Sequence, residues 1–259
     1  MSDPLAARFA AWRSAHHTAL IPYITAGYPT RASTADVLQR LVRAGADIIE
    51  LGVPFSDPVA DGPTIQRASQ VALEQGVDLA WTLDQLRCFR READTPVVIF
   101  SYLNPVLAYG WSRFISDAVA AGAQGVLLTD LPLGGDVALE AELESSALSL
   151  IRLVAPTTTA ERARAIARNA QGFIYYIARM GVTGARAVLP DDLPARLDAL
   201  RAVTNTPVCV GFGVSSAPQA AAVGRIADGV VVGSALIDAL DRGGPAAAAD
   251  LLAEMRRAL

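Results

Sequence analysis

Short apolar segments recur along the whole chain and alternate with longer stretches in which apolar residues stand three or four positions apart. The short segments are rich in β-branched residues, and their continuous apolarity is typical of strands buried on both faces of a sheet. Eight segments have this character, at residues 19–25, 47–51, 96–100, 125–128, 148–154, 172–177, 207–212 and 228–232.

The periodic stretches between these strands predict amphipathic helices. The clearest are at residues 34–45, 112–122, 159–170 and 193–203. Several end in glycine or asparagine just before the next strand, as at Gly45, Gly122 and Asn169, which is typical of helix C-termini. Residues 5–13 predict one further amphipathic helix ahead of the first strand.

The alternation of strand and helix continues without a proline- or serine-rich linker. Eight such units in about 250 residues are typical of an α/β fold with one parallel (β/α)8 barrel, the TIM barrel, rather than a doubly wound sheet. We therefore expect a single barrel domain over residues 1–259, with the extra N-terminal helix packed under it through Phe9 and Trp12. The loops after the second and sixth strands, 52–63 and 178–190, are long and should open at the C-terminal face, where active sites of this fold lie.

Composition narrows the class of protein. With 52% hydrophobic residues and a mean hydropathy of +0.33, the chain is apolar enough to exclude a disordered protein. No apolar run reaches the roughly 18 residues of a membrane span. A net charge of −4, with no basic run longer than two residues, argues against nucleic acid as a partner. Two cysteines and no secretion signal predict a cytoplasmic protein.

The chain contains no lysine, because all 22 of its basic residues are arginine. Schiff-base chemistry on this chain is therefore excluded. The histidines are His16 and His17 and the cysteines Cys88 and Cys209, which disfavours a serine–histidine triad, a histidine metal site and a CxxC redox pair. We expect no metal site, and acid–base groups that are carboxylates or tyrosines.

Glu50 ends an apolar strand. Side chains alternate along a strand, so Ile48 and Glu50 face one side while Ile49 and Leu51 face the other. If Glu50 faces the barrel axis, loss of solvent raises its pKa and makes it competent as a general acid and base near neutral pH. A solvated carboxylate at the rim is the more common role of a single glutamate at a strand end.

Two aspartates, Asp57 and Asp61, follow Glu50 in the loop SDPVADGP. Asp57 directly precedes Pro58, and Pro63 closely follows Asp61. An Asx turn or a helix N-cap therefore explains either aspartate as well as catalysis does.

The glycine motifs GFGVS and VGSA follow the seventh and eighth strands. Their backbone N–H groups, together with a helix that begins near Ser234, can hold an anion, and the common phosphate site of the barrel lies after these two strands. Either motif alone is often only a cap, but the two together indicate a phosphate site. In the loop after the sixth strand, Gly181 and Gly184 fit a lid or an ordinary flexible loop, and the Thr183 hydroxyl can orient a carboxylate.

Several polar residues lie at the ends of other strands. Tyr175 and Tyr176 occupy the sixth strand, where alternation sends only one of them into the barrel, and a core tyrosine is the usual alternative. Tyr102 and Asn104 follow the third strand and can line the same mouth. Asp130 ends the fourth strand, where capping of the next helix is the simpler interpretation.

The motif IELGVPFSDPVADGPTIQ (49–66), with PYITAGYP, YLNP, LLTDLP, LVAPTT, YYIARMGVTGAR, VGFGVS and GVVVGSA, resembles tryptophan synthase α subunits from end to end. The first motif is long, gapless and highly specific. The resemblance implies a (β/α)8 barrel that cleaves indole-3-glycerol phosphate to indole and glyceraldehyde 3-phosphate without a cofactor. Departures are small, because only Ala178, where serine is common, and Thr129, before the strand-four aspartate, differ from the usual motifs.

The functional residues of that family map individually onto this chain. Its catalytic glutamate and aspartate correspond to Glu50 and Asp61, and its strand-six tyrosine corresponds to Tyr175. The resemblance assigns phosphate binding to Gly184, Gly213, Gly233 and Ser234. The same resemblance implies that three further residues line the substrate, namely Tyr102, Thr183 and Phe212.

The resemblance also implies a partner. In the family, the loop of Asp57 and Pro58 and the turn of Asn104 face a pyridoxal-phosphate-dependent β subunit, in an α2β2 heterotetramer, which receives indole and condenses it with serine. The missing lysine fits, since Schiff-base chemistry would reside in the other chain. A self-sufficient lyase with a rigid loop is the alternative.

Two carboxylates suffice for this chemistry. Glu50 with a raised pKa can protonate C3 of the indole and then take the hydroxyl proton, while ionised Asp61 can stabilise or accept the N1 proton. A phosphosugar isomerase or epimerase would share the phosphate motifs, yet many such enzymes use a metal or histidine. A non-catalytic activating subunit would be expected to lack Glu50 or Asp61, and both are present.

Overall fold

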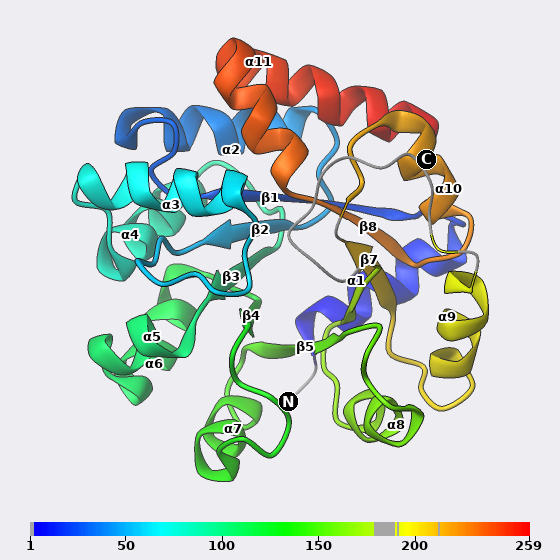
Figure 1. Ribbon diagram of the computed structural model, residues 1–259. Helices are drawn as coiled ribbons and strands as arrows, with labels where there is room; N and C mark the ends of the chain where they lie inside the picture. The colour runs from blue at the N-terminus through cyan, green and yellow to red at the C-terminus, as the bar shows by residue number, and fades with distance from the viewer. Residues whose placement is uncertain (1–2, 179–189, 191, 212) are drawn as a thin grey trace.

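A computed structural model of the chain, which describes residues 3–178, 190, 192–211 and 213–259, contains a closed barrel of eight parallel strands (Figure 1). The strands are β1 (Ala19–Thr25), β2 (Ile49–Gly52), β3 (Val97–Ser101), β4 (Gly125–Leu128), β5 (Ser149–Val154), β6 (Ile174–Ile177), β7 (Val208–Gly211) and β8 (Gly229–Val232). Each strand pairs with the next, and β8 pairs back to β1, with Gly229 opposite Ala19. The TIM barrel expected from the alternating pattern is confirmed.

Helices connect the strands and surround the barrel (Figure 1). They are α1 (Pro4–Ser14), η1 (Arg31–Ser33), α2 (Thr34–Arg43), α3 (Pro63–Glu74), α4 (Leu79–Phe89), α5 (Leu103–Tyr109), α6 (Trp111–Ala121), α7 (Val137–Glu144), α8 (Ala160–Arg168), α9 (Leu193–Arg201), α10 (Ala217–Gly224) and α11 (Ser234–Ala258). Helix α11 is kinked at Gly243 and Gly244, whose backbone angles are not helical.

The expected strands and the clearest expected helices are all present, with ends that differ by at most two residues. Gly122 ends α6 in a left-handed conformation, as its C-terminal signal predicts. The interval between β2 and β3 is long because it holds the loop 53–62 and also two helices, α3 and α4. Most of the expected long loop after β6, residues 179–189, lies outside the described residues.

Alternation along each strand sends one set of side chains to the barrel axis and the other to the surrounding helices. The axial set includes Ile21, Ile48, Val98, Leu127 and Ile151, none of them more than 2% exposed. Their neighbours in sequence pack under the helices in a second, larger core. The barrel interior is therefore filled by side chains, and any polar group on the axis is removed from water.

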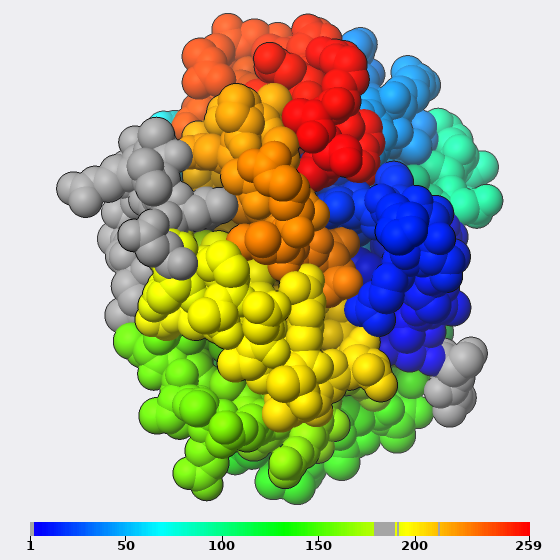
Figure 2. Space-filling view, turned by 90° about the vertical axis from the view of Figure 1, so that its right-hand side faces the viewer, coloured from blue at the N-terminus to red at the C-terminus, as the bar shows by residue number. Residues whose placement is uncertain are grey.

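Helix α1 closes the N-terminal end of the barrel. It belongs to the blue segment in Figure 2. Phe9 is buried, and its ring lies 5.0 Å from the ring of Trp12 and 5.8 Å from that of Phe173, which belongs to the axial core. Leu5, one helical turn earlier, is fully buried in the same cluster. The expected packing of Phe9 and Trp12 under the barrel is confirmed.

Asp3 attaches this helix to the strands. Its carboxylate caps α1 by accepting the Leu5 N–H at 3.0 Å. It also accepts the Ser149 hydroxyl at 2.8 Å and the Gly172 N–H at 2.5 Å, at the beginning of β5 and just before β6. One carboxylate therefore joins the helix start to two strands.

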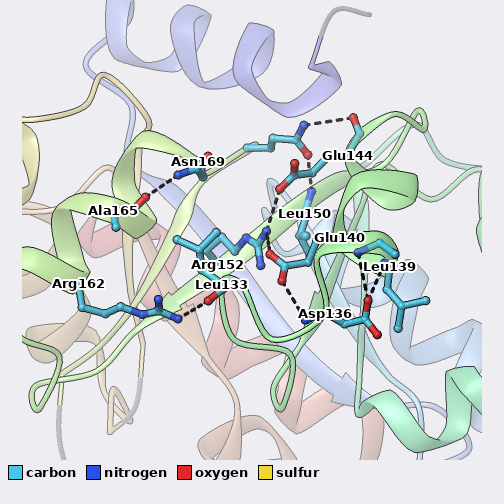
Figure 3. Close-up of polar contacts among 12 residues, drawn as sticks. Leu133, Asp136, Leu139, Glu140, Glu144, Leu150, Arg152, Arg162, Ala165 and Asn169 are labelled. Atoms are coloured by element: carbon cyan, nitrogen blue, oxygen red, sulfur yellow. Dashed lines mark hydrogen bonds and ion pairs between the residues drawn. The ribbon is translucent and has the colours of Figure 1, made fainter.

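A buried ion cluster joins α7 to β5 (Figure 3). Arg152 points outward from β5, is 3% exposed, and donates from Nη2 to Glu140 at 2.7 Å and to Glu144 at 2.8 Å. Glu140 is itself 5% exposed, whereas Glu144 reaches the surface. Removing the arginine would leave a buried carboxylate without a counter-charge, which is strongly unfavourable.

We expect Arg152→Ala to lower the free energy of unfolding by about 3 kcal/mol or more, because breaking a buried ion pair from one side leaves the other charge uncompensated. Urea unfolding followed by circular dichroism measures the loss. Arg40→Ala, which breaks the exposed pair with Asp36, is the matched control and should cost less than about 1 kcal/mol. Equal small losses in both variants would show that the cluster does not stabilise the fold.

Candidate active site

Glu50 lies inside the barrel on β2, opposite Tyr23 of β1 and Val98 of β3. It is 1% exposed, and neither carboxylate oxygen has a hydrogen-bond partner among the described residues. Ile48 shares its axial face, as the alternation predicts. Burial raises the pKa of Glu50 to about 8. The alternative of a solvated carboxylate at the rim is therefore wrong.

Asp61 is held at the barrel mouth by Tyr102. The Tyr102 hydroxyl donates to Asp61 Oδ2 at 2.9 Å and accepts the Ala60 N–H at 3.0 Å. Asp61 is 4% exposed, and burial raises its pKa to about 6, while the hydrogen bond from Tyr102 acts in the opposite direction. The N-cap interpretation of Asp61 is wrong, because the residue that caps α3 is Gly62.

Two tyrosines are within electrostatic reach of both carboxylates. Tyr175 faces the axis from β6, and Tyr176 faces the helices. The pKa of Tyr175 is raised by burial and then by the charges of Glu50 and Asp61, and the pKa of Tyr23 on β1 is raised by burial, Asp61 and Glu50 as well. Sequence reasoning missed Tyr23. The signal that finds it is its register, directly opposite Glu50.

Glycines make room for both tyrosine hydroxyls. A Cβ at Gly52 would lie 2.3 Å from Tyr23 Oη, and a Cβ at Gly211 would lie 2.2 Å from Tyr175 Oη. In both cases the tyrosine pairs with the residue two positions before the glycine on the neighbouring strand. The same arrangement therefore occurs twice, at β1–β2 and at β6–β7, and it sets both hydroxyls over the ends of those strands.

The expected phosphate residues that the structure describes, Gly213, Gly233 and Ser234, follow β7 and β8 at the same end of the barrel. Helix α11 begins at Ser234, directly after Gly233. A Cβ at Gly233 would meet Tyr23 and Ile65 only at ordinary contact distances of 3.6 and 3.7 Å. Gly213 has a φ of +97°, a conformation that favours glycine. Three of the expected residues lie outside the described part of the chain, namely Thr183, Gly184 and Phe212.

The residues expected to face a partner stand on the outer rim of this mouth. Asp57 and Asn104 are exposed, and Pro58 is half-buried. Between Pro58 and the buried Asp61, Val59 is 84% exposed, a large exposure for an apolar side chain. The loop therefore has a buried end that Tyr102 holds and an exposed end that faces solvent.

Asp130 acts differently from the expectation. Its carboxylate accepts the Leu103 N–H at 2.7 Å, at the start of α5 in the preceding unit. The expected capping of the next helix is wrong, because Asp136 caps α7. Since Leu103 directly follows Tyr102, Asp130 helps to position the residue that holds Asp61.

Within the described ranges, no three His, Cys, Asp or Glu side chains are grouped so that they could hold a metal ion. No helix in the same ranges has the length and apolarity needed to span a membrane. Both cysteines are free, with Cys209 buried on the barrel axis and Cys88 exposed.

Comparison with known proteins agrees with this geometry. The family model described as tryptophan synthase alpha chain matches residues 9–257. The tryptophan synthase alpha chain of Laribacter hongkongensis is 48% identical over 256 residues, 97% of each chain. The corresponding protein of Xanthomonas euvesicatoria is 49% identical, covering 97% of this chain and 96% of its own length. The chain belongs to the tryptophan synthase alpha chain family.

Solved structures support the same assignment. A tryptophan synthase structure from Mycobacterium tuberculosis matches with a TM-score of 0.93 and 40% identity, covering 100% of this chain and 98% of that one. The tryptophan synthase subunit alpha of Legionella pneumophila matches with a TM-score of 0.90 and 36% identity at the same coverage. Family membership makes the chain an enzyme of tryptophan synthesis, a lyase.

The raised pKa of Glu50 predicts a pH-dependent stability. The folded state favours the protonated carboxyl, so the wild-type chain loses stability as the pH rises from about 4.5, where the unfolded chain ionises, to about 8. Glu50→Gln removes this loss. The free energy of unfolding of the variant should therefore exceed that of the wild type by an amount that grows across this range and reaches roughly 3 to 5 kcal/mol by pH 8. Urea unfolding at pH 5 and pH 8 measures it, and the exposed Glu92→Gln serves as the control. A pH-independent difference would mean that Glu50 is solvated.

Proposed function

We propose that this chain cleaves indole-3-glycerol phosphate to indole and glyceraldehyde 3-phosphate in a retro-aldol reaction carried out by Glu50 and Asp61. The observation that carries the proposal is the presence of two buried carboxyl groups at the barrel mouth with pKa values of about 8 and about 6. At neutral pH, Glu50 is then mostly protonated and Asp61 mostly ionised. A pair of carboxyl groups whose environments separate their pKa values is suited to act as acid and base in one site.

The protons balance over the reaction. Glu50 gives its proton to C3 of the indole ring, and the positive charge that develops extends to N1, where ionised Asp61 accepts a hydrogen bond. The Glu50 carboxylate then takes the proton of the hydroxyl beside the scissile bond. The oxygen forms a carbonyl, the carbon–carbon bond breaks, and its electrons restore the indole. Glu50 ends protonated again, ready for the next substrate.

Two tyrosines lie beside the two carboxyl groups, Tyr102 next to Asp61 and Tyr175 near Glu50. Tyr102 donates to Oδ2 of Asp61, and we assign the other oxygen to the indole N–H. Tyr175, a core tyrosine with its hydroxyl over Gly211, borders the space above Glu50. Both side chains are buried, at 3% and 5% exposure, so they offer the substrate fixed surfaces rather than mobile ones.

The substrate phosphate is assigned to Gly213, Gly233 and Ser234, with Gly184 by resemblance. The start of α11 at Ser234 presents backbone N–H groups and the positive end of the helix dipole at the mouth. No lysine is needed for such a site. Remote binding of the phosphate can serve the cleavage by fixing the glycerol chain.

Glu50→Gln and Asp61→Asn should each lower the lyase rate by roughly two orders of magnitude or more, the range for loss of a general acid or base. In the wild type, kcat/KM should fall below about pH 6, where Asp61 is protonated, and above about pH 8, where Glu50 ionises. Indole release from indole-3-glycerol phosphate is the readout, and it also excludes an isomerase or epimerase, which would release none. A variant that keeps the wild-type rate removes its residue from the mechanism.

Gly233→Asp should raise KM at least about tenfold, because the new carboxylate repels the phosphate at close range. A Cβ fits at this position, so the variant should fold. Gly233→Asn has nearly the same shape without the charge and is the matched control. If Asp and Asn raise KM equally, crowding rather than charge accounts for the effect, and if neither does, the phosphate binds elsewhere.

We also infer a β-subunit partner in an α2β2 heterotetramer, docked on the rim formed by Asp57, Pro58 and Asn104. Support comes from the exposed apolar side chains beside these residues, Val59 on the loop and Leu107 on α5, which are 84% and 45% exposed. Because Ala60 and Asp61 are both bonded to Tyr102, a partner that orders this loop would act directly on the catalytic aspartate.

The double variant Asp57→Ala, Pro58→Gly should weaken activation by a cognate β subunit while leaving the basal lyase rate nearly intact. Glu92→Ala, between α4 and β3 at the other end of the barrel, should leave both unchanged. Indole formation with and without the β subunit gives the rates, and sedimentation gives the assembly. If the β subunit changes neither quantity for the wild-type chain, a free-standing lyase is the better description.

We further infer one domain over residues 1–259 and a cytoplasmic location. The closed ring needs both β1 and β8, so the first and last strands belong to one unit. The two free cysteines are compatible with a reducing compartment.

A further inference from the structure

A cleft of about 240 Å³ lies outside the barrel, between α8 and α9 and over the outer face of β5 and β6. Figure 2 looks onto this side of the molecule, with α9 in yellow. The walls and floor of the cleft are mainly apolar, formed by Val154, Ala160, Ala163, Tyr176, Ala199 and Leu200. Because Tyr176 faces outward where Tyr175 faces the axis, this space is separated from the candidate active site by the barrel wall.

Two guanidinium groups border the cleft, and they differ in their partners. Arg196 is engaged on every side, since it bonds Asp192 at 2.7 and 2.8 Å, the Pro156 carbonyl at 2.7 Å and the Tyr176 hydroxyl. Arg164 is exposed and has no ion-pair or hydrogen-bond partner among the described residues. In the part of the chain that the structure describes, no carboxylate therefore compensates this positive charge in the cleft.

The surroundings of Arg164 favour an anion further. Ala160 is the first residue of α8, so the positive end of that helix dipole faces the same space. The carboxylate of Asp192, which could attract an ammonium group, is already bound by Arg196. A monoanion therefore fits better than a zwitterion. The volume is below the usual range for drug-sized ligands, about 300–1,000 Å³, and suits a single ring with one charged group.

We propose that this cleft binds a small aromatic carboxylate, with the carboxylate on Arg164 and the ring against Tyr176 and Leu200. The site is distinct from the barrel mouth and does not depend on the proposed lyase reaction. Tyr176 is the residue next to Tyr175, so a ligand seated here would contact the outer side of the strand that lines the candidate active site.

Benzoate is the probe, and benzamide, which has nearly the same shape without the charge, is its control. Calorimetric titration of the full chain should give a Kd of about 1 mM for benzoate, the affinity expected of so small a ligand. Benzamide should bind at least fivefold more weakly. Arg164→Gln should weaken benzoate at least fivefold and leave benzamide nearly unchanged, whereas Arg168→Gln, exposed on the same helix, should stay within twofold of the parent.

Two further measurements locate the probe. Ala163→Leu fills the cleft and should weaken both compounds, with thermal melting confirming that each variant is folded. Glycerol 3-phosphate is expected to bind at the proposed phosphate site in the barrel mouth, and it should therefore leave the affinity for benzoate unchanged. The proposal is overturned if benzoate does not bind at 10 mM, if Arg164→Gln and Arg168→Gln behave alike, or if glycerol 3-phosphate displaces the probe. None of these outcomes bears on indole release.

Discussion

Closure of the sheet between β1 and β8 is the constraint on which the rest of the molecule depends. Once the ring is closed, every strand has one face toward the axis and one toward the helices, and no strand edge is left open. The axis is packed with large apolar side chains. Any carboxyl group placed there loses its water. The raised pKa of Glu50 is therefore a result of where the strand lies, and among the described residues no neighbouring charge contributes to it.

The residues of the candidate site lower the stability of the folded chain. Glu50 has no hydrogen-bond partner among the described residues, so its ionised form on the barrel axis is unfavourable above its ordinary pKa, and the surrounding core must compensate for it. The glycines beside the two tyrosines add a second constraint. At Gly52 and Gly211 any side chain would collide with a buried ring, so the mouth allows little variation in its walls. This arrangement is typical of an active site, where the exact positions of the reacting groups matter more for function than the stability of any one strand.

The sequence was sufficient for the order of elements because the period of apolar residues changes clearly between strand and helix. It was also sufficient to place Ile48 and Glu50 on one face. It could not decide whether that face was the axis, because an axial and a rim glutamate have the same local sequence. The sequence does not single out Tyr23, because β1 is buried along its whole length and no alternation of polar and apolar residues distinguishes its inner face. The sequence around Asp130 predicts a cap on the following helix, whereas its partner, Leu103, lies 27 residues earlier in the chain, where no local pattern points.

The attachment of α1 has a consequence for the order in which the protein is made. Asp3, Leu5 and Phe9 leave the ribosome well before their partners at Ser149, Gly172 and Phe173 are synthesised. Until those partners have emerged, the apolar face of α1 has no barrel to cover. A nascent chain therefore exposes Leu5 and Phe9 while the residues up to Phe173 are synthesised, and chaperones that protect new chains from aggregation can bind there.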